Sequence, residues 1–425
     1  MRMARFGVVT AACLLVAASV YADPLTCTMT GYKAQPGMAV TAADNAVTVT
    51  WDGEHNQEIR ARFTINGGTP TLADLSVRAK GGTWASLATD AVPEYKVVSG
   101  IRRATDQQLK PLHELGTKVT PEVLDYMRWE AFWDSPLNVP GTTVAHAGAT
   151  PPVDGIADQP GLPRKPEEIK RASAQWAVKG CEVKTNGLRT ELSFPGVTLG
   201  VFSGRLEYQF YKGSSLIRQA VIAKTTDRAV AYKYDAGLSG LAITPKSQIF
   251  WRTNTSGQWV DNHLGGPKND DVVALKAANR IVAAEVSGGS MVAFPPPHNF
   301  FWARETEFNL GYNWFRKDSD TRYAFGVRQA EGEEEASWEG HGPEDRRQNF
   351  ALYSARPNTW QRMAVYLYVS ADAARKAVDG AMAYTRNDMY KPLPGYQVMA
   401  THFHTGLVPR LKGLGGLDQT LPDLD

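Results

Sequence analysis

The sequence has few cysteines, no excess of either charge and no long apolar run beyond its first residues. Only three of its 425 residues are cysteine, and the first, Cys13, lies in the N-terminal apolar stretch. Lys and Arg number 46 against 44 Asp and Glu. Removing a leader that contains Arg2 and Arg5 leaves 44 of each, which argues against a protein that coats nucleic acid or another polyanion.

Several local signatures of catalysis are also missing. The chain has no G-x-S-x-G elbow, no H-E-x-x-H pair, no phosphate-binding P-loop, no C-x-x-C motif and no clear internal repeat. Serine-hydrolase, zincin, nucleotide-binding and thioredoxin functions therefore have no local support.

The first 22 residues have the features of a secretory signal peptide. Arg2 and Arg5 precede the apolar stretch Phe6 to Val20, and Val20-Tyr21-Ala22 resembles a cleavage site. A lipid anchor on Cys13 is disfavoured, because the apolar run before it is short and continues beyond it. No later segment approaches the roughly 20 apolar residues of a membrane span. We therefore expect a secreted or periplasmic protein without a membrane span.

Two cysteines remain after the leader, Cys27 and Cys181. In an oxidising compartment they can join the N-terminus to the middle of the chain, provided that their Cα atoms lie close enough. Two buried free thiols are the equally open alternative.

Most of the chain consists of short alternating apolar and polar runs separated by turn residues, the pattern of an antiparallel sheet with one solvated face. The pattern predicts a mainly β fold, a large antiparallel β-sandwich with a few short helices and one C-terminal helix. The runs that predict strands are 46–51, 58–65, 187–200, 205–211, 216–223, 228–234, 248–252, 281–286, 291–294, 323–328, 350–354 and 361–369.

Helix signals and proline clusters divide the chain. A short helical stretch is expected within 106–133, and the C-terminal helix over 371–384. The expected organisation is a signal peptide (1–22), a sandwich domain (23–390) whose two sub-parts (23–140 and 167–390) are joined by a Pro-rich loop, a linker (391–395), and the start of another domain (396–425).

Residues 204–238 resemble the consecutive long strands of galactose-mutarotase-like sandwiches, the fold that accompanies many polysaccharide lyases and glycoside hydrolases. The resemblance is one of pattern and has no diagnostic signature. It implies a carbohydrate as substrate or ligand, so a glycan is the expected partner.

Aromatic and polar residues between 298 and 314 are candidates for that site. Trp302 and Trp314 can stack on a sugar ring, and Arg304 can bind its hydroxyls or a carboxylate. His298, Arg304 and Glu305 are the candidate catalytic groups for acid–base chemistry. Core packing is the alternative for each aromatic, because a large sandwich buries many rings.

The stretch Thr401-His402-Phe403-His404-Thr405 follows an apolar run. On a strand, side chains two residues apart point the same way, so His402 and His404 can bind one metal ion. The stretch resembles the first-strand motif of PHP-type and related amidohydrolase-like barrels, which implies a metal-ligand role for these two residues. Later strands supply the remaining ligands in those families, so a divalent metal is expected only if a downstream domain completes the site.

Together these features predict an exported β-sandwich module, the N-terminal part of a larger carbohydrate-active or metal-dependent hydrolase. One alternative is a self-contained polysaccharide lyase or sugar epimerase that acts on uronic-acid glycans and uses His298 or His263 with Arg304. The other is a non-catalytic structural module of the cell envelope. The sequence leaves the glycan and the oligomeric state open.

Overall fold

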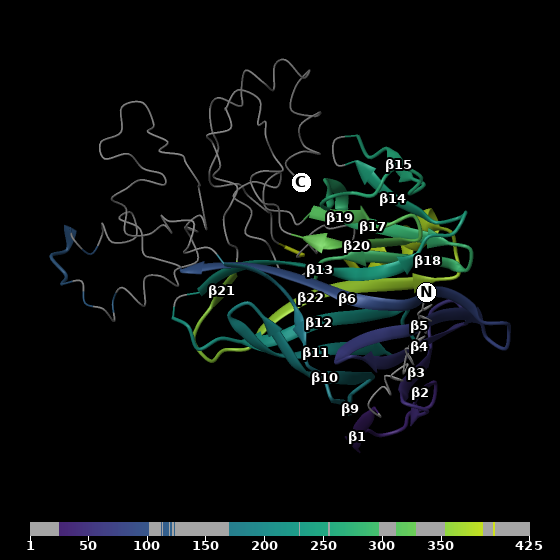
Figure 1. Cartoon of the computed structure of the whole chain (residues 1–425), viewed down its shortest axis with the longest axis horizontal. Helices are drawn as coiled ribbons and strands as arrows, with labels where there is room; N and C mark the ends of the chain where they lie inside the picture. The colour runs from purple at the N-terminus through teal and green to yellow at the C-terminus, as the bar shows by residue number, and fades with distance from the viewer. Residues whose placement is uncertain are drawn as a thin grey trace, which may run out of the picture.

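Two large β-sheets stacked face to face form the body of the protein in the computed structural model (Figure 1). The structure describes residues 25–101, 112, 114–118, 120, 123, 170–228, 230–253, 256–296, 312–328, 353–385 and 394–395. Each sheet contains 11 strands within these ranges. The prediction of a large, mostly antiparallel β-sandwich with a C-terminal helix is confirmed.

The first sheet has the strand order β1-β9-β10-β11-β12-β22-β18-β17-β14-β15, and β8 pairs with β10. The bounds of its strands are β1 Thr26–Gly31, β8 Gln175–Trp176, β9 Gly180–Asn186, β10 Arg189–Leu199, β11 Phe202–Tyr211, β12 Leu216–Lys224, β14 Gln248–Thr253, β15 Trp259–Asn262, β17 Ala277–Val286, β18 Gly289–Phe294 and β22 Gln361–Ser370.

The second sheet has the order β16-β19-β20-β13-β6-β5-β4-β3-β2, with β21 paired to β13 and β7 to β6. Its strands are β2 Met38–Ala43, β3 Ala46–Asp52, β4 Gln57–Asn66, β5 Thr69–Ala79, β6 Ala85–Ile101, β7 Lys170–Ser173, β13 Val230–Ala242, β16 Val273–Leu275, β19 Tyr312–Lys317, β20 Arg322–Arg328 and β21 Tyr353–Ala355. Strands from before and after the Pro-rich stretch therefore share one sheet, because β6 lies between β5 and β13.

Alternation along each strand decides which face meets the other layer. In β11, Leu206, Tyr208 and Phe210 lie in the main core, as their spacing predicts. Arg205 and Glu207 point to the opposite face of the first sheet. The outer face of a sheet is the face turned away from the other sheet.

Aromatic rings fill the space between the layers. Trp51 of the second sheet lies 5.0 Å from Phe210 of the first, and Phe63 lies 4.6 Å from Tyr208, measured between ring centroids. These tilted contacts are worth about 0.5–1.5 kcal/mol each beyond the burial of apolar surface.

Two polar bridges cross the same core. The Gln219 side chain in β12 accepts a hydrogen bond from Tyr208 (3.0 Å) and donates one to the carbonyl oxygen of Gly237 in β13 (2.9 Å). The Tyr234 hydroxyl of β13 donates to the carbonyl oxygen of Ala364 in β22 (2.9 Å) and accepts from its N–H (3.1 Å). The bridges fix how the two sheets lie against each other.

Cys27 and Cys181 form a disulfide, with their Cα atoms 4.4 Å apart. They are direct partners in the parallel pairing of β1 with β9, which departs from the antiparallel expectation. No hairpin joins these strands, since 154 residues separate the cysteines, so turn geometry does not set their direction. The alternative of two free thiols does not hold in this structure.

The C-terminal helix α4, Ala374–Thr385, packs on the outer face of the first sheet. Ala374, Ala377, Val378 and Ala381 make up its buried stripe, three to four residues apart as in an amphipathic helix. The predicted helix over 371–384 is thus confirmed with a shift of its start by three residues. No helix among the described residues is long and apolar enough to cross a membrane.

A single carboxylate links α4 to the turn between β3 and β4. Glu54 in that turn accepts hydrogen bonds from the Tyr368 hydroxyl (2.9 Å) and the Tyr384 hydroxyl, and Tyr384 also bonds Ser214 (2.8 Å). Burial raises the pKa of Tyr384 to about 12, so its hydroxyl keeps its proton at neutral pH. Glu54 therefore joins elements of both sheets and the helix.

We expect Glu54→Ala to lower the free energy of unfolding by about 1–3 kcal/mol, because two hydroxyls lose their acceptor inside the fold. Chemical denaturation followed by circular dichroism measures the change. Glu182→Ala is the matched control, since that carboxylate pairs with Lys184 at an exposed site, and surface pairs contribute roughly 0–1 kcal/mol. Equal stability of the two variants would show that the Glu54 contacts do not support the fold.

Candidate functional site

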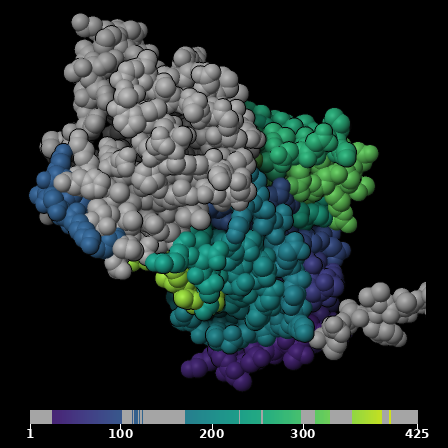
Figure 2. Space-filling model, turned by 60° about the vertical axis from the view of Figure 1, so that its left-hand side comes forward, coloured from purple at the N-terminus to yellow at the C-terminus, as the bar shows by residue number. Residues whose placement is uncertain are grey.

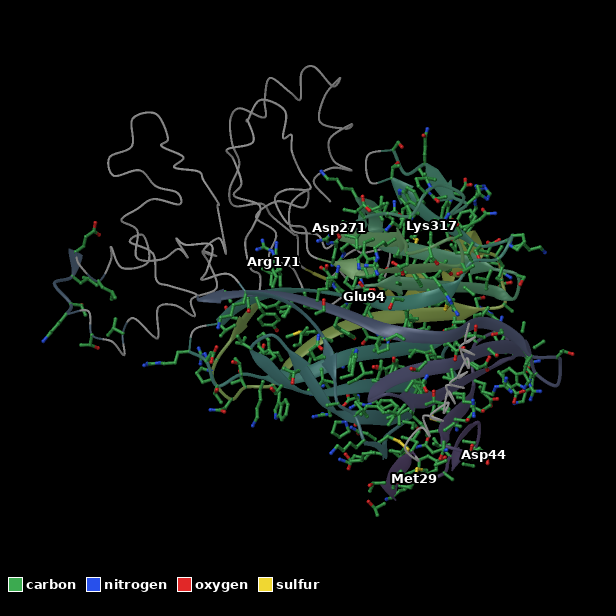
Figure 3. All side chains as sticks on the ribbon, in the orientation of Figure 1. Met29, Asp44, Glu94, Arg171, Asp271 and Lys317 are labelled. Atoms are coloured by element: carbon green, nitrogen blue, oxygen red, sulfur yellow. A yellow bond between two sulfur atoms is a disulfide. The ribbon has the colours of Figure 1, made fainter. Side chains whose placement is uncertain are left out.

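Charged side chains gather on the outer face of the second sheet, where only solvated polar residues are expected. In β13, Tyr232, Tyr234 and Ala236 point into the core, so Lys233 and Asp235 point outward. The same alternation places charged residues of β6, β7, β19 and β20 on this face. We define the charged face as Glu94, Lys96, Arg171, Lys233, Asp235, Arg316, Asp318 and Arg328. Figure 3 shows Glu94 and Arg171 on this sheet, away from Met29 and Asp44 at the opposite end of the sandwich.

Trp314, an expected sugar-stacking residue, lies at this face. Its neighbours Asn313 and Phe315 are on the core side, and Trp314 belongs to none of the apolar clusters formed by the described residues. Only 1% of its surface is exposed, and its indole N–H donates to the Val327 carbonyl oxygen at 3.0 Å. No ring face is open to solvent in this conformation, so the packing alternative describes Trp314 here.

Two facing glycines make room for the Trp314 ring. Gly237 in β13 and Gly326 in β20 are direct partners in the antiparallel register. A Cβ at Gly237 would lie 2.9 Å from Cζ2 of Trp314 and 2.2 Å from the carbonyl oxygen of Phe325. The two glycines therefore present no side chain on the sheet surface where the indole ring of Trp314 extends across β20 to β13.

Beside this ring, Arg316 is held by two carboxylates. Its guanidinium forms a two-pronged pair with Glu94, with both N···O distances 2.8 Å, and it also donates to Asp318. The hydrogen bonds with Glu94 raise the pKa of Arg316 above its already high value. Planar double bonding of this kind fixes the orientation of the guanidinium as well as its charge.

Two further cations on this face are almost inaccessible to water. Lys233 is 2% exposed and Arg328 is 7% exposed, and a nitrogen of Arg328 lies 3.6 Å from Asp235. Taking charges out of water is costly, so a buried group of this type marks either a structural network or a binding or catalytic site. Cations outnumber carboxylates five to three on the charged face, which favours anionic ligands.

The remaining predicted residues of the sugar site precede β19 in the chain. β19 begins at Tyr312, β20 ends at Arg328, and these two residues are direct partners. His298, Trp302, Arg304 and Glu305 lie outside the described part of the chain. They stay predictions.

The predicted metal ligands His402 and His404 also lie outside the described residues. Within the described residues, no group of three or more His, Cys, Asp or Glu side chains is arranged to hold a metal ion. His263, the other histidine considered for catalysis, is exposed after β15 of the first sheet and lies 3.0 Å from Asp261. It does not belong to the charged face.

Sequence reasoning missed Glu94, Lys233, Asp235 and Arg328. The signal was present in the Tyr232-Lys233-Tyr234-Asp235 alternation, where charged residues occupy every second position of a strongly apolar strand. Such a pattern shows on which face of the sheet each residue lies, but it cannot show that Lys233 and Arg328 are nearly inaccessible to water.

We expect a double-mutant cycle between Arg316→Met and Glu94→Gln to give a coupling of about 1–3 kcal/mol in unfolding free energy. Either single substitution already removes the charge-assisted double hydrogen bond, so the second substitution should cost less in the double variant than it does alone. The Lys80 and Asp52 pair on the same sheet, exposed and singly bonded, should couple by less than about 1 kcal/mol. Similar values for the two pairs would contradict the special role of the Arg316 pair.

Comparisons with known proteins give fold likeness only. No family model matches the chain, and no curated protein matches it in sequence. A candidate aldose 1-epimerase from Escherichia coli K12 aligns with 79% of this chain and 99% of its own, at 10% identity and a TM-score of 0.32. A second candidate aldose 1-epimerase, from Klebsiella pneumoniae, aligns with 85% of this chain and 91% of its own, at 9% identity and a TM-score of 0.31. A TPR-domain containing protein from Parabacteroides distasonis aligns with 84% of this chain and 50% of its own, at 10% identity and a TM-score of 0.33. Two of the three are named for sugar chemistry, but at these scores the likeness assigns neither family nor activity.

Proposed function

We propose that the chain is an exported, carbohydrate-associated β-sandwich module that binds an acidic glycan on the charged face of its second sheet. The observation that carries the proposal is the gathering of five cations on one outer sheet face. Such a face suits a carboxylate-bearing sugar, because guanidinium and ammonium groups pair with carboxylates through charge-assisted hydrogen bonds.

The accessible edge of the charged face is the place where binding would begin. Lys96 and Arg171 come from the paired strands β6 and β7 and are open to solvent, unlike Lys233 and Arg328. The register pairs Val98 with Arg171 and Lys96 with Ser173, so Lys96 and Arg171 are close neighbours on one face. Two adjacent cations can hold one uronate carboxylate or two successive ones.

We expect the double variant Lys96→Ala/Arg171→Ala to weaken the binding of an acidic oligosaccharide by about tenfold, since two exposed charge contacts contribute roughly 0.5–1 kcal/mol each. Titration calorimetry with oligogalacturonate, oligoalginate and hyaluronan fragments at low salt measures the loss. The double variant Lys212→Ala/Lys246→Ala removes two exposed lysines outside this face and is the matched control. Equal affinity in wild type and Lys96→Ala/Arg171→Ala, or an equal loss in the control, would reject the charged face as the binding site.

An enzymatic version of the proposal is the second candidate function. Lyase chemistry on a uronic-acid glycan needs a base and a cation that neutralises the sugar carboxylate. The closeness of Asp235 and Arg328 on a face rich in cations supplies groups of both types. Appearance of unsaturated sugar products on incubation with uronic-acid polymers, and their loss in Asp235→Asn, would support a lyase. A well-folded protein that neither cleaves nor binds any glycan would favour a structural envelope module.

The larger-protein context remains part of the proposal. The support is the His402 and His404 pair in a segment that resembles the first strand of a metallohydrolase barrel. An immunoblot of the native protein tests it, together with the coding sequence beyond codon 425. A native species well above 46.5 kDa is the expected result. A native product of 46.5 kDa would instead leave the two histidines without a metal site.

A further inference from the structure

An exposed tryptophan stands on the outer face of the other sheet, where β22 begins. Trp360 immediately precedes β22, and 51% of its surface is exposed. The other large apolar side chains with high exposure among the described residues are Leu115 and Leu188, both aliphatic. In Figure 2, yellow-green atoms from the β21 and β22 end of the chain lie at the surface beside teal atoms from the middle of the chain.

Two cations lie against the Trp360 ring. The Arg205 guanidinium carbon is 5.5 Å and the Lys224 amine nitrogen 5.2 Å from the ring centroid, which is the range of cation–π contacts. Arg205 belongs to β11 and Lys224 to β12, and both strands lie on the same side of β22. The two cations therefore approach from one side, and a large part of the ring stays open.

A third cation, Arg362, follows two residues after Trp360 and so lies on the same face. The register places it beside Ile222, which in turn pairs with Arg205. Arg205 is already paired with the buried carboxylate of Glu207 at 3.0 Å. Lys224 and Arg362 are exposed, and neither has a carboxylate partner among the described residues. Two positive charges next to an open ring therefore lack a compensating carboxylate in the part of the chain that the structure describes.

Trp84 on the second sheet shows the contrast with a self-contained arrangement. Arg60 and Arg78 lie 4.6 Å and 4.3 Å from its ring centroid. Each of these arginines is paired with a carboxylate, Arg60 with Asp74 at 3.0 Å and Arg78 with Glu58 at 2.7 Å. Both cations at Trp84 are balanced by carboxylates, whereas at Trp360 only Arg205 has such a partner among the described residues.

We infer that Trp360, Lys224 and Arg362 form a surface subsite for one carboxylated sugar residue of an acidic polysaccharide. The apolar face of a pyranose ring stacks on the open side of Trp360, and the sugar carboxylate pairs with Lys224 and Arg362. Nucleic acid also combines rings with anions, but a balanced overall charge and a patch of two free cations do not suit a polyanion of that density. The subsite lies on the sheet opposite to the charged face, and its ligand class follows from its own ring and cations.

The test compares the full chain with Trp360→Ala and with Lys224→Ala/Arg362→Ala by calorimetric titration against oligogalacturonate, oligoalginate and hyaluronan fragments. Each oligosaccharide is also used after chemical reduction of its carboxylates to neutral alcohols. Leu188→Ala, which removes an exposed apolar side chain from the turn between β9 and β10, is the control for Trp360→Ala. Lys212→Ala/Lys246→Ala is the control for the loss of two charges.

We expect each subsite variant to bind at least one acidic oligosaccharide about fivefold to tenfold more weakly, with both controls near wild type. The reduced oligosaccharides should bind wild type and the Lys224→Ala/Arg362→Ala variant equally weakly. Unchanged affinity in Trp360→Ala, or equal binding of acidic and reduced forms by wild type, overturns the inference. So does binding to vesicles of anionic lipid without binding to any of the sugars.

The same titrations separate this inference from the proposed function. Weakened binding in Trp360→Ala with unchanged binding in Lys96→Ala/Arg171→Ala keeps the subsite and rejects the charged face. The reverse result rejects the subsite and keeps the charged face. Wild-type protein that binds none of the acidic oligosaccharides overturns both.

Discussion

The hydrogen bond from Gln219 to the Gly237 carbonyl oxygen is one of the two polar bridges that fix β13 of the second sheet against the first sheet. It holds β13 at one position against the first sheet from inside the core. On the other side of the same residue, the missing Cβ of Gly237 leaves room for the Trp314 ring. A single position therefore fixes the sheet from within and accommodates the ring at the charged face, so a shift in β13 would disturb core and surface together.

The two outer faces carry different chemistry because they are covered differently. Helix α4 packs its small residues on part of the first sheet and leaves the strand ends near Trp360 open. On the second sheet, Lys233 and Arg328 are nearly inaccessible although they point away from the core. The first sheet thus presents cations at an exposed aromatic ring, and the second holds two cations shielded from water beside the exposed Lys96 and Arg171. Exposed groups suit the capture of a long polymer, and shielded ones suit selective contacts with a single sugar.

The strands, their alternation and the C-terminal helix could be predicted from the sequence, because each depends on a local period of apolar residues. Leu206, Tyr208 and Phe210 were assigned to one face on spacing alone, and they lie in the core. The parallel pairing of β1 with β9 could not be predicted, because no turn joins the two strands. Glu94 and Arg316 are 222 residues apart, so their pair depends on the order of strands in the sheet and leaves no local signal. Tryptophan is a residue type that stacks on sugar rings, but whether the Trp314 ring is open to solvent depends on the fold around it.

The parallel partnership of β1 and β9 has a consequence for how the molecule can be assembled. β1 is an edge strand whose partner in the sheet is β9, and β9 is made some 154 residues later in the chain. A protein that emerges N-terminus first must therefore keep Cys27 unpaired until the middle of the chain has arrived. Between residues 23 and 425, Cys181 is the only other cysteine, so within that stretch no wrong partner competes for Cys27 during that wait. Within that stretch, oxidation of Cys27 before Cys181 has been made can join it only to another molecule.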